Sequence, residues 1–185
     1  MGLMPNSDTA LIVIDVQESF RQESCWLDKP EFVANLQKLV DGARQQGIPV
    51  VQVFHVEDSG TFSVASGLVK TLHEVSVVPD ATFHKTRHSA LIGSGLGIWL
   101  VEKGIRKVII SGIRTEQCCE TTARHASDMG YQVDFCTEAT LTFDMTDRHG
   151  KVWRTEEIMA ATELVLDGRF ARIVTVDNAI DSLPA

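Results

Sequence analysis

The sequence predicts an α/β protein built on a parallel sheet, and two patterns carry that prediction. Short apolar runs without alternation, such as ALIVI at 10–14, are typical of strands that a parallel sheet buries on both faces. Longer stretches with apolar residues at helical spacing separate these runs, and this alternation is the signature of the α/β class. The 185 residues fit one domain, and we expect that domain to span 1–185.

The predicted elements follow one another along the chain. Runs rich in apolar and β-branched residues predict strands at 10–14, 49–54, 81–84, 107–110, 131–135 and 173–176. Helical spacing of apolar residues predicts helices at 31–46, 96–103, 115–129 and 155–166, each closed by a glycine at or near its end. The segment 57–79 has no regular pattern, and we expect it to form a lid or a subunit contact.

Charge and hydropathy limit the partners and the location. The net charge of -8 argues against nucleic acid, which needs a basic face, and against an anionic membrane surface. No apolar run approaches the ~20 residues of a membrane helix. The first residues lack the cationic start and the cleavage site of a signal peptide. We therefore expect a cytoplasmic protein without nucleic-acid or membrane partners.

The cysteines do not follow the spacing of a structural metal site. There are four of them, Cys25, Cys118, Cys119 and Cys136. In a reducing compartment they should mostly be thiols. Because no CxxC pair occurs, a structural zinc site is not expected.

Asp15 directly follows the first predicted strand. Ligands of open parallel sheets bind beyond the carboxyl ends of the strands, so an acid at this point is a candidate site residue. Taken alone, however, an aspartate there is more often a helix cap or a solvated turn residue.

Cys118 follows the strand at 107–110, which ends at Ser111-Gly112, and the turn that comes after it. With Thr115 as the N-cap, Cys118 falls in the first helical turn. Free N–H groups and the helix dipole stabilise anions there, so we expect a lowered thiol pKa. The same N–H groups can hold the oxyanion of an acyl transfer. Cys118 is therefore the candidate nucleophile.

The neighbouring cysteine has a different predicted role. Cys119, Ala123 and Ala126 form a stripe of small residues at helical spacing, which predicts packing of Cys119 on the sheet. Cys118 is turned about 100° from this stripe and can face the crevice. Without further motifs, packing of both cysteines in the core would be equally consistent with the pattern.

Three motifs together resemble the isochorismatase-like cysteine hydrolase superfamily, over about 9–176. The first is ALIVIDVQESF, which contains Asp15. The second is FHKTRHSAL, which is similar to the family's K-x-x-x-S-A-F element and contains Lys85. The third is SGIRTEQCCETTARHASDMGYQV, which is similar to S-G-x-x-T-x-x-C-V-x-x-T-A-x-x-A-x-x-x-G-Y-x-V and contains Cys118. Lys85 becomes a candidate only through this resemblance.

The resemblance implies a three-layer α/β/α fold with a mostly parallel six-stranded sheet in the order 3-2-1-4-5-6. It implies a catalytic triad of Asp15, Lys85 and Cys118, and a cis peptide bond at Ile113-Arg114. The N–H groups of Arg114 and Cys118 would then form the oxyanion hole. The family also implies a homo-oligomer, a dimer or a tetramer.

The implied reaction is hydrolysis of a small-molecule amide through a thioester. Asp15 takes the thiol proton of Cys118, donates it to the leaving nitrogen and later activates water, while Lys85 holds both groups electrostatically. One alternative is an isochorismatase-type ether or ester hydrolase on the same scaffold. A second is a catalytically silent binding or thiol-redox protein that uses Cys118 and Cys119.

Several other residues are candidates for the substrate pocket. They are Gln17, Phe20, Trp26, His55 and Phe143, with core or interface positions as the alternative for the aromatic ones. Arg114 could contact a substrate carboxylate or be simply exposed. His88, His125 and His149 have no convergent partners in the sequence.

We expect no metal and no other cofactor. Nicotinamidases of this family bind a metal through an Asp-x-His pair, and that spacing is missing from FHVEDSGTF. His55 is present in this segment, and the next histidine, His73, lies in a predicted loop.

Overall fold

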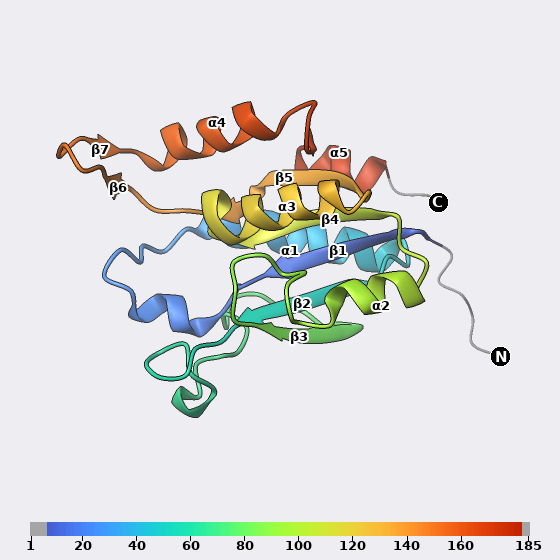
Figure 1. The fold of residues 1–185 in the computed structure, drawn as a ribbon, viewed down its shortest axis with the longest axis horizontal. Helices are drawn as coiled ribbons and strands as arrows, with labels where there is room; N and C mark the ends of the chain where they lie inside the picture. The colour runs from blue at the N-terminus through green and yellow to red at the C-terminus, as the bar shows by residue number, and fades with distance from the viewer. Residues whose placement is uncertain (1–6, 183–185) are drawn as a thin grey trace.

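The computed structural model describes residues 7–182, and its centre is a six-stranded sheet in which all paired strands are parallel. The strand order is β3-β2-β1-β4-β5-β8 (Figure 1). The strands are β1 (Thr9–Ile14), β2 (Val50–His55), β3 (Ala81–Lys85), β4 (Lys107–Ile113), β5 (Gln132–Leu141) and β8 (Arg172–Ile173). The implied order 3-2-1-4-5-6 is confirmed.

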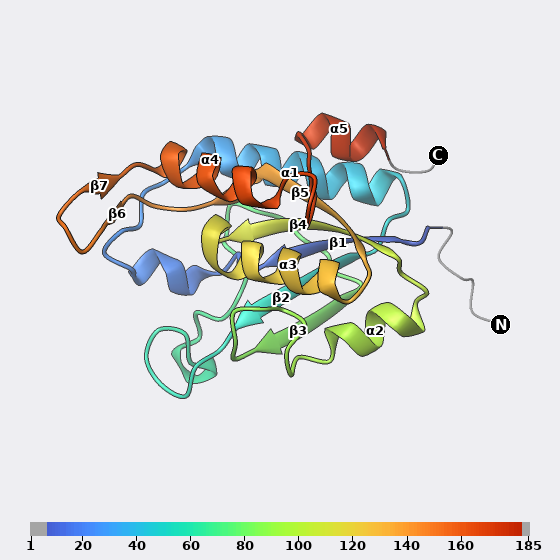
Figure 2. The same ribbon diagram turned by 45° about the horizontal axis from the view of Figure 1, so that its top comes forward.

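The sixth strand of the sheet is the eighth along the chain because a separate hairpin precedes it. This hairpin pairs β6 (Met145–Thr146) with β7 (Val152–Trp153) in antiparallel fashion. It lies beyond the carboxyl ends of the central strands and leads into α4 (Thr155–Leu166) (Figure 2).

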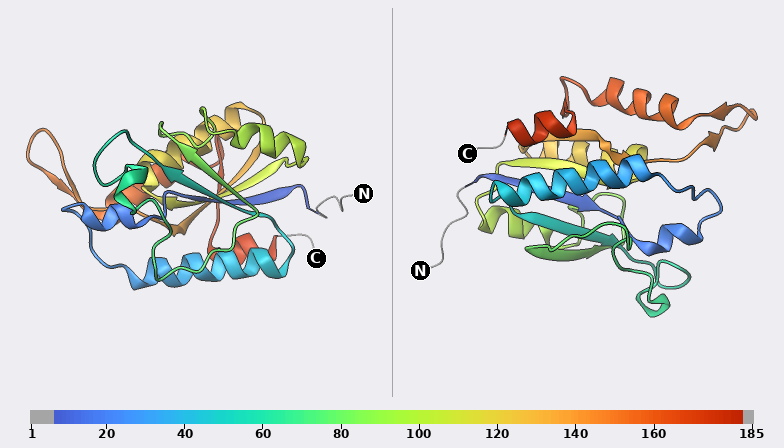
Figure 3. Two further views of the ribbon diagram at one scale, coloured as in Figure 1. Left: turned by 90° about the horizontal axis from the view of Figure 1, so that it is seen from below. Right: turned by 180° about the vertical axis from the view of Figure 1, so that it is seen from behind.

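Helices cover both faces of the sheet, as the sequence predicts. α2 (Leu96–Glu102) and α3 (Glu120–Asp128) lie on the face seen in Figure 1. α1 (Pro30–Gln45) and α5 (Val176–Asp181) lie on the opposite face (Figure 3). α4 packs against α3 and extends past the edge of the sheet. None of the helices within residues 7–182 combines the length and apolar character needed to cross a bilayer.

Two apolar cores lie on either side of the sheet, and β1 contributes to both. Leu11 and Val13 face the core beneath α1, whereas Ile12 and Ile14 face the core beneath α2 and α3. All six residues of β1 are buried. Burial of one such aliphatic side chain contributes about 1.5–3 kcal/mol to the stability of the fold. The buried strand β1 therefore holds the residues at its carboxyl end in a fixed position.

Two predicted elements differ in the structure. The predicted strand at 173–176 shrinks to β8, because Thr175 caps α5 by accepting a hydrogen bond from the N–H of Asn178 at 3.1 Å. The predicted helix at 115–129 divides into a π-helical turn, η3 (Thr115–Cys119), and α3. Both differences arise from local hydrogen bonds that apolar periodicity does not report.

The segment 57–79 contains one 3₁₀ turn, η2 (Val64–Ser66), and packs beside the residues that follow β1. Backbone N–H groups of Glu18 and Ser19 donate to the carbonyls of Lys70 and Leu68 at 2.9 and 3.1 Å. Its proposed role as a lid or subunit contact stays a prediction.

Gly112 on β4 has no room for a side chain. It pairs with Ile14, has φ of +126°, and a Cβ added to it would lie 1.9 Å from the carbonyl oxygen of Ile14. We expect Gly112→Ala to lower the free energy of unfolding by about 3–5 kcal/mol, the upper end of single-substitution effects, because β1 and β4 must separate. Urea denaturation would measure this change.

A matched control for Gly112 lies at Gly104, which also has a positive φ, +68°, but no atom within 4 Å of an added Cβ. Gly104→Ala should cost only the strain of a left-handed residue, about 1–2 kcal/mol. Equal losses in the two variants would contradict the clash at Ile14.

Candidate active site

Three elements bring Asp15, Lys85 and Cys118 together at the carboxyl ends of the strands. Asp15 follows β1, Lys85 ends β3, and Cys118 lies in η3. The Lys85 Nζ lies 2.7 Å from Asp15 Oδ2 and 3.3 Å from Cys118 Sγ. Lys85 is 1% exposed, and a lysine is so fully buried only when its charge is paired. The structure therefore places the three predicted residues in one cluster.

The backbone at Asp15 adopts an unusual conformation. Its φ is +53°, and it is the only residue other than glycine with a positive φ in the described part of the chain. The Asp15 N–H donates to the carbonyl of Val53 at 2.8 Å. A left-handed residue other than glycine is strained and persists only where its surroundings enforce it, and such residues cluster at functional sites.

The turn that carries Cys118 is wider than an α-helical turn. The carbonyl of Arg114 accepts hydrogen bonds from the N–H groups of Gln117 and Cys119, both at 3.2 Å. The peptide bond at Ile113-Arg114 is cis. Single π-helical turns of this kind occur frequently at functional sites.

The prediction of Thr115 as the N-cap is wrong. Arg114 occupies the cap position and makes no side-chain cap bond. The Thr115 hydroxyl instead lies 2.8 Å from the hydroxyl of Thr140 on β5. A buried hydroxyl needs a partner, and the neighbouring strand supplies one that the linear sequence does not show.

The expected lowering of the Cys118 pKa is also wrong. Burial raises the pKa of Cys118 from 9.0 to about 12, the charge of Asp15 adds to this rise, and Lys85 opposes it. Burial likewise raises the pKa of Asp15, against the opposing effect of Lys85. Removal from water disfavours a charged group more than one turn of helix dipole favours it. Cys118 is therefore a thiol at rest, beside the Asp15 carboxyl whose basicity is increased.

This raised pKa predicts the alkylation behaviour of Cys118. Below its pKa the thiolate fraction grows about tenfold per pH unit, so the rate of reaction with iodoacetamide should climb from roughly pH 6 to 9 without a plateau. Peptide mass spectrometry resolves the label on Cys118. A rate that levels off near neutral pH would show a low-pKa thiolate and contradict the effect of burial.

The predicted core role of Cys119 is confirmed. Cys119, Ala123 and Ala126 are buried in the apolar core between α3 and the sheet. Burial raises the pKa of Cys119 well above its ordinary value of 9.0. The two adjacent cysteines thus lie in different surroundings, because Cys118 contacts Lys85 and Cys119 does not.

Gln17 and His55 form a polar support beside the cluster. The Gln17 amide donates from Nε2 to the carbonyl of His55 at 3.0 Å and accepts from the His55 N–H at 2.8 Å. Gln17 is fully buried, and these two hydrogen bonds connect the segment after β1 to the end of β2. The Nδ1 of His55 lies 3.4 Å from Lys85 Nζ, and burial, followed by the charge of Lys85, lowers the pKa of His55.

The aromatic pocket candidates fall into two groups. Phe20 meets Phe62 edge to face at 5.1 Å between centroids, and Phe62 in turn meets His55 at 5.9 Å. Trp26 and Phe143 lie 5.8 Å apart. The first group is therefore connected to the Lys85 cluster through His55.

Arg114 belongs to the second aromatic group. Its guanidinium lies over the Phe143 ring at 5.1 Å, and Nη2 donates to Cys25 Sγ at 3.2 Å. The Arg114 side chain is half-buried, so the alternative of a simply exposed residue does not hold.

Sequence reasoning missed His88 and misjudged His125. The Nδ1 of His88 lies 3.8 Å from Cys118 Sγ, and the Nδ1 of His125 lies 2.8 Å from the Ser89 hydroxyl. The only sequence signal was the position of His88 three residues after Lys85 in the second motif. The expectation that these two histidines lack partners is wrong.

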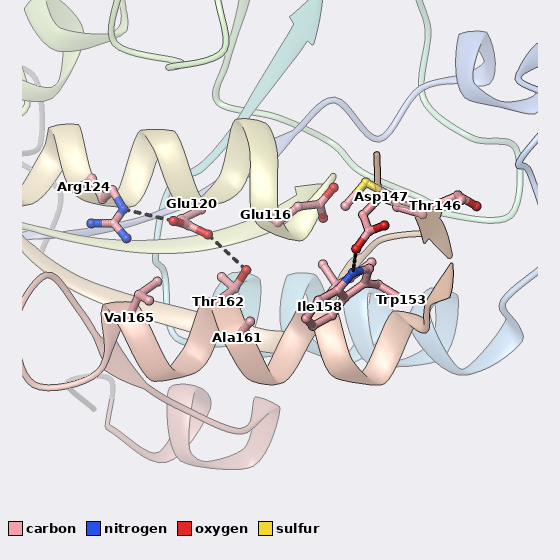
Figure 4. A pocket seen from close by; sticks show the side chains of 11 residues that line it. Glu116, Glu120, Arg124, Thr146, Asp147, Trp153, Ile158, Ala161, Thr162 and Val165 are labelled. Carbon is pink, nitrogen blue, oxygen red and sulfur yellow. Dashed lines mark hydrogen bonds and ion pairs between the residues drawn. The ribbon is translucent and has the colours of Figure 1, made fainter. Parts of the chain in front are cut away.

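A cavity of about 540 Å³ lies between α3, α4 and the β6–β7 hairpin (Figure 4). Glu120 crosses one end of it, accepting from Arg124 and from the Thr162 hydroxyl, both at 3.0 Å. None of Asp15, Lys85 and Cys118 lines this cavity, so it is separate from the cluster.

Within residues 7–182, one group of side chains is compact enough to suggest a metal site. It consists of Glu18, His73 and Glu74, whose candidate ligand atoms lie within 4.8 Å of one another. The His73 Nδ1 lies 2.9 Å from Glu18, and Arg21 forms ion pairs with both glutamates. Because Arg21 already neutralises these carboxylates, we interpret the group as an ion-pair cluster.

Comparison with known proteins assigns the chain to a family. Residues 9–166 match the isochorismatase domain. The chain belongs to the isochorismatase family. Nicotinamidase 3 of Arabidopsis thaliana is 31% identical over 196 residues, which cover 97% of this chain and 91% of the relative. A ureidoacrylate amidohydrolase of Variovorax paradoxus is 28% identical over 173 residues, which cover 72% and 69%.

A crystal structure of an isochorismatase-family protein from Chromobacterium violaceum shares this fold. It has a TM-score of 0.87 and 26% identity, and the match covers 99% of this chain and 97% of the other. The resemblance drawn from the three motifs is confirmed. Because the isochorismatase family is hydrolytic, the chain is a hydrolase by family, and the Asp15–Lys85–Cys118 cluster is its candidate active site.

Proposed function

We propose that this isochorismatase-family protein is a cysteine-dependent hydrolase of a small amide. The observation that carries the proposal is Lys85, whose buried Nζ lies within 2.7 Å of Asp15 and 3.3 Å of Cys118. A base, a cation and a nucleophile within contact distance are the components of covalent acyl transfer. Two relatives named nicotinamidase and ureidoacrylate amidohydrolase support amide chemistry over other hydrolysis.

In the first half-reaction the sulfur of Cys118 attacks the amide carbon. Asp15 takes the thiol proton during the attack, and Lys85 stabilises the negative charge that passes between the two groups. The N–H groups of Arg114 and Cys118 hold the oxyanion. Asp15 then donates its proton to the leaving nitrogen, and ammonia or an amine departs. The raised pKa of Asp15 suits this exchange, because the carboxyl must carry the proton for part of the cycle.

In the second half-reaction water hydrolyses the thioester on Cys118 and releases a carboxylic acid. Cleavage of an ether or ester on the same scaffold would release an alcohol or enol in place of ammonia. A thiol-redox role would require a bond between Cys118 and Cys119, and both are free thiols here.

The test is a panel of small carboxamides incubated with the full chain. We expect ammonia release from at least one member, and an acyl adduct on the Cys118 peptide when the reaction is quenched in acid. Esters that are hydrolysed while all amides stay intact would favour the ester alternative. No adduct from any member would overturn the proposed mechanism.

A further inference from the structure

The Lys85 ammonium has a third neighbour besides Asp15 and Cys118. An ammonium carries three N–H groups, and it can only donate. The carboxylate of Asp15 forms an ion pair with it at 2.7 Å, and the sulfur of Cys118 accepts from it at 3.3 Å. The Nδ1 of His55, which pairs with Lys85 in the register of β2 and β3, lies 3.4 Å away. A buried N–H group without an acceptor is costly, so His55 completes the set of partners.

The contact with Lys85 fixes which ring nitrogen of His55 carries the proton. Because Lys85 can only donate, Nδ1 must present a lone pair, and the ring proton then lies on Nε2. Nε2 lies 3.4 Å from a carboxylate oxygen of Glu57, which can accept a hydrogen bond from it. The bond that one ring nitrogen makes generally sets the state of the other. Lys85 and Glu57 therefore favour the same neutral tautomer.

Other contacts hold the His55 ring in place. The backbone N–H and carbonyl of His55 both bond to the side-chain amide of Gln17, at 2.8 and 3.0 Å. The ring of Phe62 meets the imidazole edge to face, with 5.9 Å between centroids. The position of Nδ1 is thus set from the backbone and from the ring, so this nitrogen can in turn locate the group that donates to it.

Protonation of His55 would place a second cation against Lys85. The charged groups that face the ring are Lys85 on β3, Asp15 after β1, and Glu57 beyond the end of β2. Burial, followed by the charge of Lys85, lowers the pKa of His55 below its ordinary value of 6.5, and the two carboxylates oppose this change. The ring is therefore neutral at pH 7. An imidazolium has no lone pair on Nδ1, so the bond from Lys85 is lost once the ring gains a proton.

We propose that neutral His55 is a positioning residue that turns the Lys85 ammonium toward Asp15 and Cys118, an inference that rests on the proposed function. Its Nδ1 accepts one N–H bond of Lys85 and fixes the rotation of the ammonium. The other two N–H bonds are then directed at the carboxylate and at the sulfur. His55 acts only through Lys85 and takes no proton from the thiol, the substrate or water.

Two substitutions separate the acceptor of His55 from its bulk. His55→Asn places a carbonyl oxygen close to the position of Nδ1 but cannot gain a proton, whereas His55→Leu has no acceptor. With an amide that the wild type hydrolyses, we expect His55→Leu to lower kcat about tenfold or more with little change in KM, the scale of effect when a buried donor loses its acceptor. His55→Asn should retain most of the turnover at neutral pH. Equal urea midpoints would show that the fold is unchanged.

The pH dependence gives a readout that a merely structural role would not move. The ratio of kcat/KM in His55→Asn to that in the wild type largely cancels the titration of Asp15, Lys85 and Cys118, which both proteins share. We expect this ratio to be constant near neutral pH and to rise as the pH falls below the ordinary histidine value of 6.5, because only the wild type gains a proton at this position.

His84→Asn is the matched control for the pH series. His84 is exposed on β3 next to Lys85, and its ring faces Phe54 at 6.3 Å between centroids. Its ratio to the wild type should stay constant at every pH. A constant ratio for His55→Asn as well, or equal loss of turnover in His55→Asn and His55→Leu, would overturn the positioning role and leave the amide hydrolase proposal intact.

Nitrogen-15 NMR of the full chain tests the tautomer without a substrate. Signals that are absent from His55→Asn identify the ring of His55. At neutral pH they should show a proton on Nε2 and none on Nδ1, and in Lys85→Met the ring should titrate at a higher pH because the neighbouring cation is gone. A proton on Nδ1 of the wild type at neutral pH would overturn the inference. The expected tautomer in a wild type that hydrolyses no amide would overturn the proposed function and leave the bond between Lys85 and His55 standing.

Discussion

Replacement of Cys118 with alanine is expected to lower amide turnover by roughly 10⁴-fold or more, the scale of loss when a covalent nucleophile is removed. Cys118 is the one cysteine within contact distance of Lys85 in the described chain. Without its sulfur, no thioester forms, and the remaining groups can only orient water. Turnover of an amide from the carboxamide panel, measured as ammonia release, checks this result.

Cys119→Ala is the matched control for Cys118→Ala, because it removes a sulfur from the adjacent residue. Cys119 is fully buried, so its loss should cost about 1 kcal/mol or somewhat more in stability and leave most of the turnover. Equal loss of turnover in both variants would show that the assigned division between nucleophile and core residue is wrong.

Lys85→Met is expected to lower turnover by about 10³-fold and the stability at neutral pH by about 3–5 kcal/mol. Methionine has a similar length and an apolar end, so the change mainly removes the charge. Breaking a buried ion pair by removing one partner leaves the other charge uncompensated, which is the source of this loss. Ammonia release and urea denaturation measure the two effects.

The stability loss in Lys85→Met should depend on pH in a defined direction. Burial already raises the pKa of Asp15, and loss of Lys85 removes the main opposing effect. A carboxyl with a raised folded-state pKa binds its proton more tightly in the folded protein than in the unfolded chain. The variant should therefore approach wild-type stability below the ordinary aspartate pKa and lose stability as pH rises. A deficit that shrinks with rising pH would contradict this account.

The double variant Asp15→Asn/Lys85→Met separates charge from packing. Neither residue then carries a charge, so we expect stability to recover by about 2–4 kcal/mol relative to Lys85→Met while turnover stays absent. A double variant as unstable as Lys85→Met would show that Lys85 acts by filling space.

Much of the fold could be predicted because the relevant signals are local. The strand at 10–14 and the helix at 31–46 are long apolar or periodic patterns, and the structure has them as β1 and α1. The prediction of a strand at 173–176 was wrong for its second half. Thr175 there caps α5, which is also a local signal but a less common one. Apolar content alone does not distinguish a short edge strand from the start of a capped helix.

Parts of the candidate site could be predicted as well, and each for a different reason. Residue patterns predicted that Asp15 follows a buried strand. They also predicted that Cys118 lies at the start of a helix. Lys85 followed from the family motif alone, because nothing local marks a lysine as buried. His88 was not predicted, since its contact with Cys118 crosses 30 positions of sequence and depends on how the loop 86–91 meets α3.

The sequence by itself determined the α/β class, the core position of Cys119 and the family to which the chain belongs. These properties depend on periodicity and on motif spacing, which the linear order of residues contains. The tertiary structure alone decided the direction in which the pKa of Cys118 departs from its ordinary value. Helix position predicts an acidic thiol, but burial beside Asp15 raises the pKa of Cys118 to about 12. Desolvation depends on every atom that surrounds a group, and only the folded chain brings those atoms together.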